Sequence, residues 1–387
     1  MPIYKAAEMQ PTPDVKNPDM MMMQFGGELM KVGIVTYHRG EGPPPHYHPN
    51  DEQFIFILEG RAAFVLGDAA HGADQRGAGE VPGGAGVDDG AVAHGAVGAQ
   101  QALDMVIQLL LAPGDDVWIE EPGYPGTRGP LIAAGARPVP LPLDEEGMLV
   151  AEGRRRAPRA RAAIVTPTHH YPLGTPMSLA RRLELLGWAR EAGAWILEDD
   201  YDSEYRYAGR PLASLLSLAA SRQEGGREAA ARVIYVGSFS KVLFPSIRVG
   251  YLVVPESLID AASAAQSALG TQPTAVIQPV LAAFIEEGHF ATHVRRMRRL
   301  YAARQEALVA AAKRHLGDLL EVPPDDAGLH LMAWLKPALA ERLGDQGAAE
   351  AAAKAGIAVS PLSDYFMERP TRQGLLLGYA AVPEDEI

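Results

Sequence analysis

The sequence predicts an α/β fold with a largely parallel sheet and helices on both faces. The first observation is that strand-like and helix-like segments alternate after residue 97. The second is that polar residues directly follow several of the strand-like segments. The third is that 47% of the 387 residues are apolar and only 21% are charged, so the chain is able to bury a sizeable core.

Helix-like and strand-like segments follow one another along the chain from residue 100. Residues 100–115, "QQALDMVIQLLLAPGD", have helical spacing and a Pro-Gly stop, and residues 116–126, "DVWIEEPGYPG", read as a short strand and a turn. Residues 161–174, "RAAIVTPTHHYPLG", repeat that design, and a helix capped by Ser178 follows. Residues 194–205 and 232–241 give two more buried strands, "AWILEDDYDSEY" and "RVIYVGSFSK". A long basic helix over 289–315 then leads into a smaller mixed region.

The N-terminal part has a different character. Residues 28–66 read as strands rich in β-branched and aromatic side chains. Residues 68–97 contain no Leu, Ile, Phe, Tyr, Trp, Met or Lys and are crowded with Gly and Ala, which predicts a loose linker, or a junction left by a fusion or frameshift. We therefore expect a β segment over 1–67, a linker over 68–97, a large domain over 98–285 and a small domain over 286–387.

Composition excludes several kinds of protein. The net charge of −13 argues against general attraction to nucleic acid or anionic membranes, and the absence of cysteine excludes disulfides and thiolate metal sites. The first residues lack a cationic start followed by an apolar core, and no run reaches membrane-spanning length. We expect a cytoplasmic protein.

Lys241 lies in the segment "GSFSKVLFPSIRVGY". We expect its surroundings to be apolar and packed, and a lysine in such a place indicates that its amine has a function. Ser238 and Ser240 precede it and Arg248 follows, so a phosphate group has hydroxyl and guanidinium partners nearby. The start of the helix at residues 98–100 would add backbone N–H groups from Gly98, Ala99 and Gln100. A lysine beside such a site predicts binding of pyridoxal 5'-phosphate as a Schiff base.

The other strand ends supply the rest of that site, because ligands of open α/β sheets bind beyond the carboxyl ends of the strands. Asp199 would face the pyridine nitrogen, Tyr201 would donate to the ring hydroxyl and Tyr124 would stack on the ring. His169 and His170 either belong to the cofactor site or only satisfy backbone groups in a turn. We take Lys241, Asp199 and Tyr201 as candidate catalytic residues.

Six motifs occur in order: "GAQQALD", "EEPGYPG", "TPTHHYPLG", "LEDDYDSEYRY", "GSFSKVLFPSIRVGY" and "AGLHLMAWL". Together they resemble the aminotransferase-like domain of MocR-type regulators, over residues 98–387. The resemblance implies fold type I, in which a mostly parallel large domain is followed by a small α/β domain. It also implies a homodimer that transfers an amino group between an amino acid and a 2-oxo acid.

The sequence departs from this family in two ways. No segment resembles the winged helix-turn-helix of these regulators, so the sequence does not support DNA binding. Asp364, in "LSDYF", stands where related proteins often carry an arginine for the substrate carboxylate, and Arg369 and Arg372 are only weak substitutes. The alternative is therefore an effector or sensor domain that binds the cofactor and an amine without turnover.

A third possibility concerns the N-terminal segment. Gly40, His46, His48, Gln53 and Gly60 have the spacing of the first motif of cupins, and a His-x-His pair on one strand points both imidazoles to the same side. The second histidine motif of cupins is missing. His46, His48 and Gln53 are candidate ligands of a divalent metal, with the alternative that the two histidines bind nothing.

Overall fold

The computed structural model describes residues 98–220, 232–269 and 277–387 in full, and the backbone of six short strands nearer the N-terminus. These strands are β1 (Thr12–Pro13), β2 (Met21–Gly27), β3 (Met30–Val35), β4 (Glu80–Val81), β5 (Ala85–Gly86) and β6 (Ala91–Ala96). Strands β1, β2 and β3 form an antiparallel sheet, and β4 pairs with β5. The predicted strands of residues 28–66 are thus represented by β3, and residues 36–66 lie outside the described ones.

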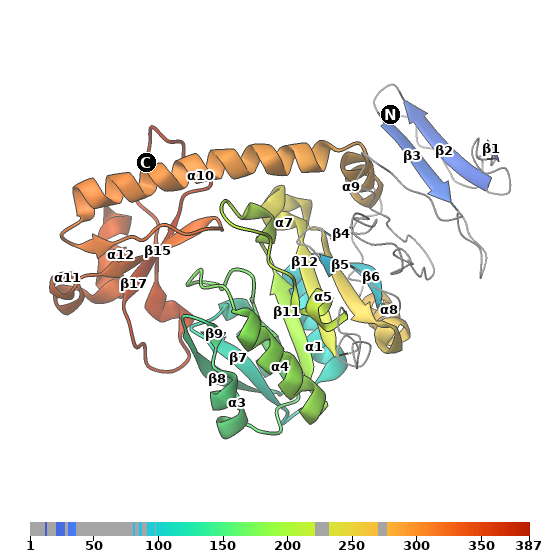
Figure 1. The fold of residues 1–387 in the computed structure, drawn as a ribbon, viewed down its shortest axis with the longest axis horizontal. Coiled ribbons are helices and arrows are strands. Elements are labelled where there is room, and N and C mark those ends of the chain that lie inside the picture. Colours follow the sequence, from blue (N-terminus) through green and yellow to red (C-terminus); the bar gives the residue numbers. More distant parts are fainter. Residues whose placement is uncertain are drawn as a thin grey trace.

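The central element is an eight-stranded sheet in the order β6-β13-β12-β11-β10-β7-β8-β9 (Figure 1). Its other strands are β7 (Asp116–Glu121), β8 (Arg137–Asp144), β9 (Gly147–Met148), β10 (Ala162–Val165), β11 (Trp195–Asp200), β12 (Val233–Ser238) and β13 (Gly250–Pro255). Strands β8, β7, β10, β11 and β12 are parallel, whereas β13 runs antiparallel to β12 and β6. The predicted mostly parallel α/β architecture is confirmed.

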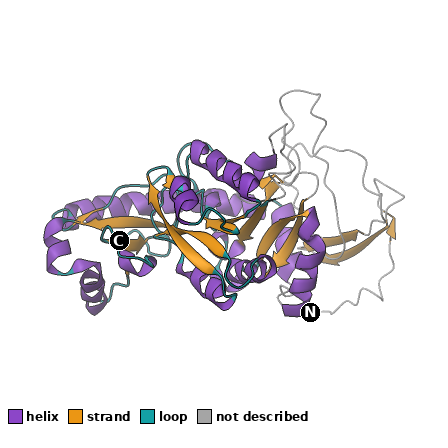
Figure 2. Ribbon diagram, turned by 90° about the horizontal axis from the view of Figure 1, so that it is seen from below, coloured by secondary structure: helices purple, strands orange, loops and turns teal. Residues whose placement is uncertain are grey.

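Helices cover both faces of this sheet (Figure 2). They are α1 (Ala99–Leu110), α2 (Arg128–Ala133), α3 (Val150–Arg156), α4 (Leu179–Ala192), α5 (Leu215–Ala220), α7 (Phe239–Val242), α8 (Ile259–Leu269) and α9 (Ile277–Glu286). Successive strand residues point to opposite faces, so Val117 packs in the core under α1, α2 and α8, while Trp118 packs in the core under α3, α4 and α5. The Trp118 ring stacks on Trp188 of α4 with centroids 3.7 Å apart.

Helix α4 begins and ends as its sequence predicts. The Ser178 hydroxyl accepts a hydrogen bond from the Arg181 backbone N–H at 3.2 Å, and Gly193 ends the helix with φ 63°, in the left-handed region. This helix buries the Trp118 face of the sheet and so fixes the strands that carry the site.

The C-terminal part begins with α10 (His289–Leu316), a helix of 28 residues that runs from α9 to a second sheet (Figure 1). That sheet has the order β14-β15-β17-β16, with β14 (Leu320–Glu321), β15 (His330–Leu335), β16 (Ser360–Pro361) and β17 (Gly374–Gly378). Helices α11 (Pro337–Arg342) and α12 (Gly344–Lys354) supply Leu339 and Ala348 to its core. The short helices η2 (Pro125–Thr127), η3 (Ser203–Tyr205), η4 (Pro245–Ile247), η5 (Glu256–Leu258) and η6 (Leu362–Tyr365) complete the described elements.

The structure differs from the sequence prediction within residues 68–97. Residues 91–96, expected to belong to a loose linker, form β6, which pairs with β13 along its whole length. Strand pairing depends on backbone hydrogen bonds, so a stretch rich in Ala and Gly is able to extend a sheet without large apolar side chains. The chain therefore enters the sheet before Gly98. No helix among the described residues is both long and apolar enough to cross a membrane.

Candidate functional site

The candidate residues come from the carboxyl ends of parallel strands, which meet at one edge of the sheet. Tyr124 follows β7, His169 and His170 follow β10, Tyr201 follows β11 and Lys241 follows β12. Strand β6 runs in the same direction and leads through residue 97 to the start of α1. The topology thus places these residues at the sheet edge where α/β proteins bind ligands.

One end of this edge is suited to an anion. Gly98, with φ 81°, precedes α1, whose first backbone N–H groups have no partner within the helix. A β-carbon at Gly98 would lie 3.6 Å from the Arg248 guanidinium carbon, so this cation lies beside the helix N-terminus. Gly250 permits the close approach, because its β-carbon would lie 3.1 Å from the Gly98 α-carbon. Ala99 and Gln100 are the first residues of the helix at this point.

The turn after β12 brings two hydroxyls and the lysine to the same edge. Ser238 caps α7 and accepts a hydrogen bond from the Ser240 backbone N–H at 3.1 Å. The Ser240 hydroxyl is itself buried and has no hydrogen-bond partner among the described residues. Lys241 is exposed, so the packed surroundings expected for its amine are wrong: Phe239 and Val242 point into the core, and Lys241 lies on the outer side of this single turn.

Asp199 is the acid of the site. It is buried, and one of its carboxylate oxygens has no hydrogen-bond partner among the described residues. Burial, with the nearby charges of Asp200 and Asp202, raises the pKa of Asp199 to about 7. It lines a small cavity together with residues of β7 and β10 and the turns after them: Ile119, Glu120, Tyr124, Thr127, Ile164, Val165 and Thr166.

The neighbouring acids of β11 have other tasks. Glu198 accepts hydrogen bonds from the backbone N–H groups of Leu215 and Leu216 at 2.8 and 3.1 Å, and so caps α5. Asp200 accepts a hydrogen bond from the Tyr235 hydroxyl at 2.7 Å. Of these acids in "LEDDY", Asp199 alone lines the cavity.

Tyr124 is held at the start of α1. Its hydroxyl donates to the Gln100 side-chain oxygen at 2.9 Å, and the Gln100 amide donates to the Gly126 carbonyl at 2.7 Å. The sequence suggested only a backbone role for Gln100. Its side chain fixes the orientation of the ring expected over the cofactor, and Tyr171 adds an edge-on contact at 5.9 Å.

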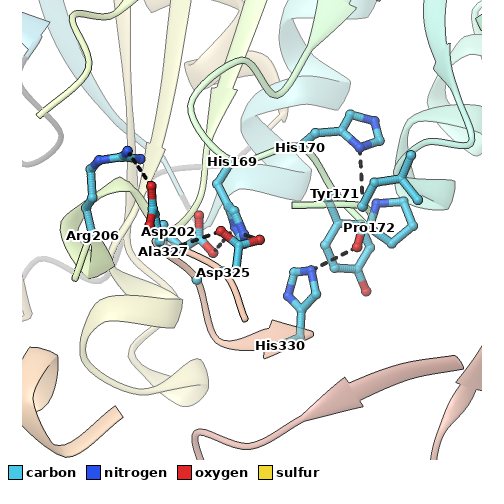
Figure 3. Close-up of polar contacts among 12 residues, drawn as sticks. His169, His170, Tyr171, Pro172, Asp202, Arg206, Asp325, Ala327 and His330 are labelled. Atoms are coloured by element: carbon cyan, nitrogen blue, oxygen red, sulfur yellow. Dashed lines mark hydrogen bonds and ion pairs between the residues drawn. The ribbon is translucent and has the colours of Figure 1, made fainter. Parts of the chain in front are cut away.

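The two histidines after β10 are both buried, but their partners differ (Figure 3). The Nδ1 atom of His169 lies 2.8 Å from Asp202 and 3.0 Å from the Tyr201 hydroxyl, and its Nε2 lies 3.6 Å from Asp325. Burial alone would lower the pKa of His169, but the charges and hydrogen bonds of Asp202 and Asp325 outweigh it and raise the pKa to about 10. His169 is therefore a cation at neutral pH.

His170 is neutral. Its Nδ1 accepts a hydrogen bond from the Leu173 backbone N–H at 3.3 Å, and its Nε2 lies 3.7 Å from Glu120. Burial and the charge of His169 lower the pKa of His170 to about 3. His170 thus accepts a hydrogen bond from a backbone N–H of the turn, whereas His169 contacts both Tyr201 and two acids.

The arginines considered for a substrate carboxylate do not converge on the cavity. Asp364 accepts a hydrogen bond from the Gln346 amide at 2.6 Å, and the Arg372 guanidinium lies 3.4 Å from the centre of the Trp334 ring. Arg369 is exposed. Arg128, which the sequence did not single out, donates to the Tyr365 carbonyl at 2.5 Å and ties the turn after β7 to η6.

The candidate metal ligands of the cupin-like segment, His46, His48 and Gln53, lie outside the described residues. Within the part of the chain that is described, no group of three or more His, Asp or Glu side chains is arranged to hold a metal ion.

Comparisons with known proteins agree with this architecture. Residues 92–376 match the family model "Aminotransferase class I and II". A probable rhizopine catabolism regulatory protein MocR of Rhizobium meliloti is 45% identical over 285 residues, covering 74% of this chain and 55% of that protein. Aromatic-amino-acid aminotransferase 1 of Thermococcus litoralis is 27% identical, covering 75% of this chain and 68% of that protein. The chain spans about half the length of the curated regulators that it matches.

Among solved structures, kynurenine aminotransferase of Pyrococcus horikoshii superposes with a TM-score of 0.69 at 26% identity, covering 78% of this chain and 73% of the other. A multiple substrate aminotransferase of Thermococcus profundus gives a TM-score of 0.67 at 26% identity, covering 76% and 72%. The family match, the mostly parallel sheet and these neighbours agree on fold type I. The chain belongs to the class I and II aminotransferase family of pyridoxal-phosphate-dependent proteins, with MocR-type regulators among its relatives.

Proposed function

We propose that this domain binds pyridoxal 5'-phosphate through Lys241 and recognises an amino compound at the cofactor, as the effector-binding part of a MocR-type regulator. The observation that carries the proposal is the unpartnered, buried carboxylate oxygen of Asp199 in the cavity beside Tyr124. A buried anionic group without a partner is costly, so a cationic ring nitrogen is the complement that this position lacks.

The residues present fit the cofactor at its other end as well. The unpartnered Ser240 hydroxyl, the Arg248 guanidinium and the N-terminus of α1 at Gly98 would hold its phosphate. When bound, pyridoxal phosphate supplies an aldehyde that condenses with amines and a ring that accepts electrons. Lys241 would provide the resident amine, and its exposure leaves it accessible to an incoming amino compound.

Two findings favour recognition over turnover. Asp364 stands at the position expected for a carboxylate-binding arginine, and its side chain is engaged by Gln346. The regulator from Rhizobium meliloti is also more similar to this chain, at 45% identity, than the Thermococcus aminotransferase, at 27%.

Transamination between an amino acid and a 2-oxo acid is the second candidate. It is favoured by three residues at this edge that suit its proton transfers: a lysine amine, the buried Asp199 and the Tyr201 hydroxyl. In this case Lys241 would move a proton at the substrate carbon, and Asp199 would keep the ring nitrogen charged.

The experiment that separates the two follows cofactor absorbance during reaction with single amino acids, with and without a 2-oxo acid. Effector recognition predicts a spectral change that ends after at most one equivalent per chain. Repeated cycles that form a new amino acid would establish the transferase and contradict the sensor. The variant Asp199→Ala is expected to lose the spectral change in either case. Asp200→Asn is expected to retain it, because the Asp200 side chain bonds to Tyr235.

The homodimer, the cytoplasmic location and the boundaries of the domains remain predictions. A metal-dependent activity of the cupin-like segment also remains a prediction, which metal analysis of the purified protein and of His46→Ala would test.

A further inference from the structure

Tyr201, the residue expected beside the ring hydroxyl of the cofactor, has an unusual partner. Among the described residues its hydroxyl has one hydrogen-bond partner, Nδ1 of His169, at 3.0 Å. The same nitrogen lies 2.8 Å from the Asp202 carboxylate, and the His169 and Asp202 side chains are each only 1% exposed. Two polar groups, the Tyr201 hydroxyl and the Asp202 carboxylate, therefore compete for one ring nitrogen.

The proton positions follow from these distances. A carboxylate only accepts hydrogen bonds, so a contact of 2.8 Å to Asp202 requires that Nδ1 carries the proton. A protonated Nδ1 is unable to accept the Tyr201 proton. The Tyr201 oxygen is therefore an acceptor on this side, and its own O–H proton remains available for another group. Burial and the charge of Asp202 raise the pKa of Tyr201 well above its ordinary value, so this proton is retained.

We infer that His169 is a positioning residue, which holds the Tyr201 hydroxyl in the orientation that donates its proton to the ring oxygen of pyridoxal phosphate. The inference rests on the proposed function, because it assumes the cofactor beside Tyr201. It assigns to His169 a task that the adjacent His170 does not share, since His170 bonds to the turn at Leu173.

Two further features fix the His169 ring. Its Nε2 faces Asp325 at 3.6 Å, on the loop between β14 and β15, so the ring is held by acids from two separate parts of the chain (Figure 3). A β-carbon at Gly328, which has φ 94°, would overlap the His169 ring. The charged and titratable groups that face His169 are Asp202, Tyr201, Asp325, His170 and His330. Both of the other histidines have a pKa lowered to about 3, by burial and by the charge of His169, so His169 is the cation of this cluster.

The test is a pH titration of the absorption band of the Lys241-bound cofactor. A hydrogen bond from Tyr201 stabilises the unprotonated form, in which the ring oxygen is more negative, so its loss raises the pKa of the band. Tyr201→Phe is expected to raise it by about 1–2 units. His169→Gln is expected to raise the pKa of the band by about 1 unit. The introduced amide carbonyl accepts a hydrogen bond from the Tyr201 hydroxyl, which then no longer donates to the cofactor. His330→Gln is the matched control, since this buried histidine bonds to the Pro172 carbonyl, and it is expected to leave the pKa of the band unchanged.

The double variant His169→Gln/Tyr201→Phe separates positioning from a general structural effect. Positioning predicts that His169→Gln adds nothing in the Tyr201→Phe background. An additive shift, or an unchanged pKa in a folded single variant, overturns the inference. If His169→Gln does not fold, Asp202→Asn replaces it in the titration. A raised pKa of the absorption band then supports positioning by His169, and an unchanged pKa overturns it.

A second readout needs no cofactor. Nitrogen NMR of the His169 ring at neutral pH is expected to show hydrogen on both nitrogens, and an unprotonated Nδ1 overturns the inference. If the wild-type protein forms no cofactor bond at Lys241, the proposed function fails and this inference falls with it. If the bond forms and only the variants disagree, the inference fails alone.

Discussion

The region around His169 and the region around His170 begin at neighbouring residues of one turn, yet one histidine is a cation and the other is neutral. Around His169, Asp202 and Asp325 stabilise a buried cation whose pKa is raised to about 10. Around His170, the nearest acid is Glu120, 3.7 Å away, and its carboxylate already accepts hydrogen bonds from the Thr166 backbone N–H and hydroxyl. The pKa of the His170 imidazole is lowered to about 3. Burial acts on both rings, so the difference comes from the partners that the fold brings to each.

Glu120 contributes to the low charge of the His170 region. Burial raises the pKa of Glu120 to about 7 despite hydrogen bonds from the Thr166 backbone and hydroxyl. A partly neutral acid beside a neutral histidine makes the His170 region nearly uncharged, whereas the His169 region concentrates charge between the main sheet and the loop before β15. Of these two histidine regions, the one that contains Tyr201 therefore holds more charge.

The largest expected effect is on stability. His169→Gln leaves Asp202 and Asp325 without their cation, and is expected to lower the free energy of unfolding by about 3–5 kcal/mol. His170→Gln loses one backbone hydrogen bond and is expected to cost about 1 kcal/mol. Denaturant unfolding of both variants at pH 7 measures the difference. Equal costs would show that the two regions are not distinguished by charge.

The pH dependence provides a second, smaller contrast. The folded pKa of His169 is raised above the unfolded value of 6.5, so its contribution is complete below pH 6.5 and is lost as the pH rises toward about 10. The stability difference between wild type and His169→Gln is therefore expected to shrink by about 1.4 kcal/mol per pH unit between these limits. A difference that stays constant from pH 7 to 9 would contradict the assigned charge.

His170 is expected to show the opposite slope. Its folded pKa lies below the unfolded value, so its contribution is complete above pH 6.5 and is lost as the pH falls toward about 3. The same unfolding series, continued from pH 6.5 to 4, compares wild type with His170→Gln. A growing advantage of the wild type in acid would refute a neutral buried His170.

The sequence predicted the sheet well, because each parallel strand is a short apolar run bounded by turn residues, as in β7, β10, β11 and β12. Asp199, Tyr201 and Lys241 also lie at or just after the ends of these strands, while their roles remain predictions. It did not separate His169 from His170, because the partner Asp325 lies more than 150 residues away along the chain. The pairing of β6, the Gln100 side-chain contact with Tyr124 and the bridging role of Arg128 likewise depend on tertiary structure.

Lys241 is the residue to which we expect pyridoxal phosphate to bond. The most direct measurement is borohydride reduction of the protein mixed with the cofactor, followed by peptide mapping of the label, with Lys241→Ala in parallel. We predict one label per chain, on Lys241, and none in the variant. A label on another lysine, or no label on a folded wild-type protein, would contradict the account.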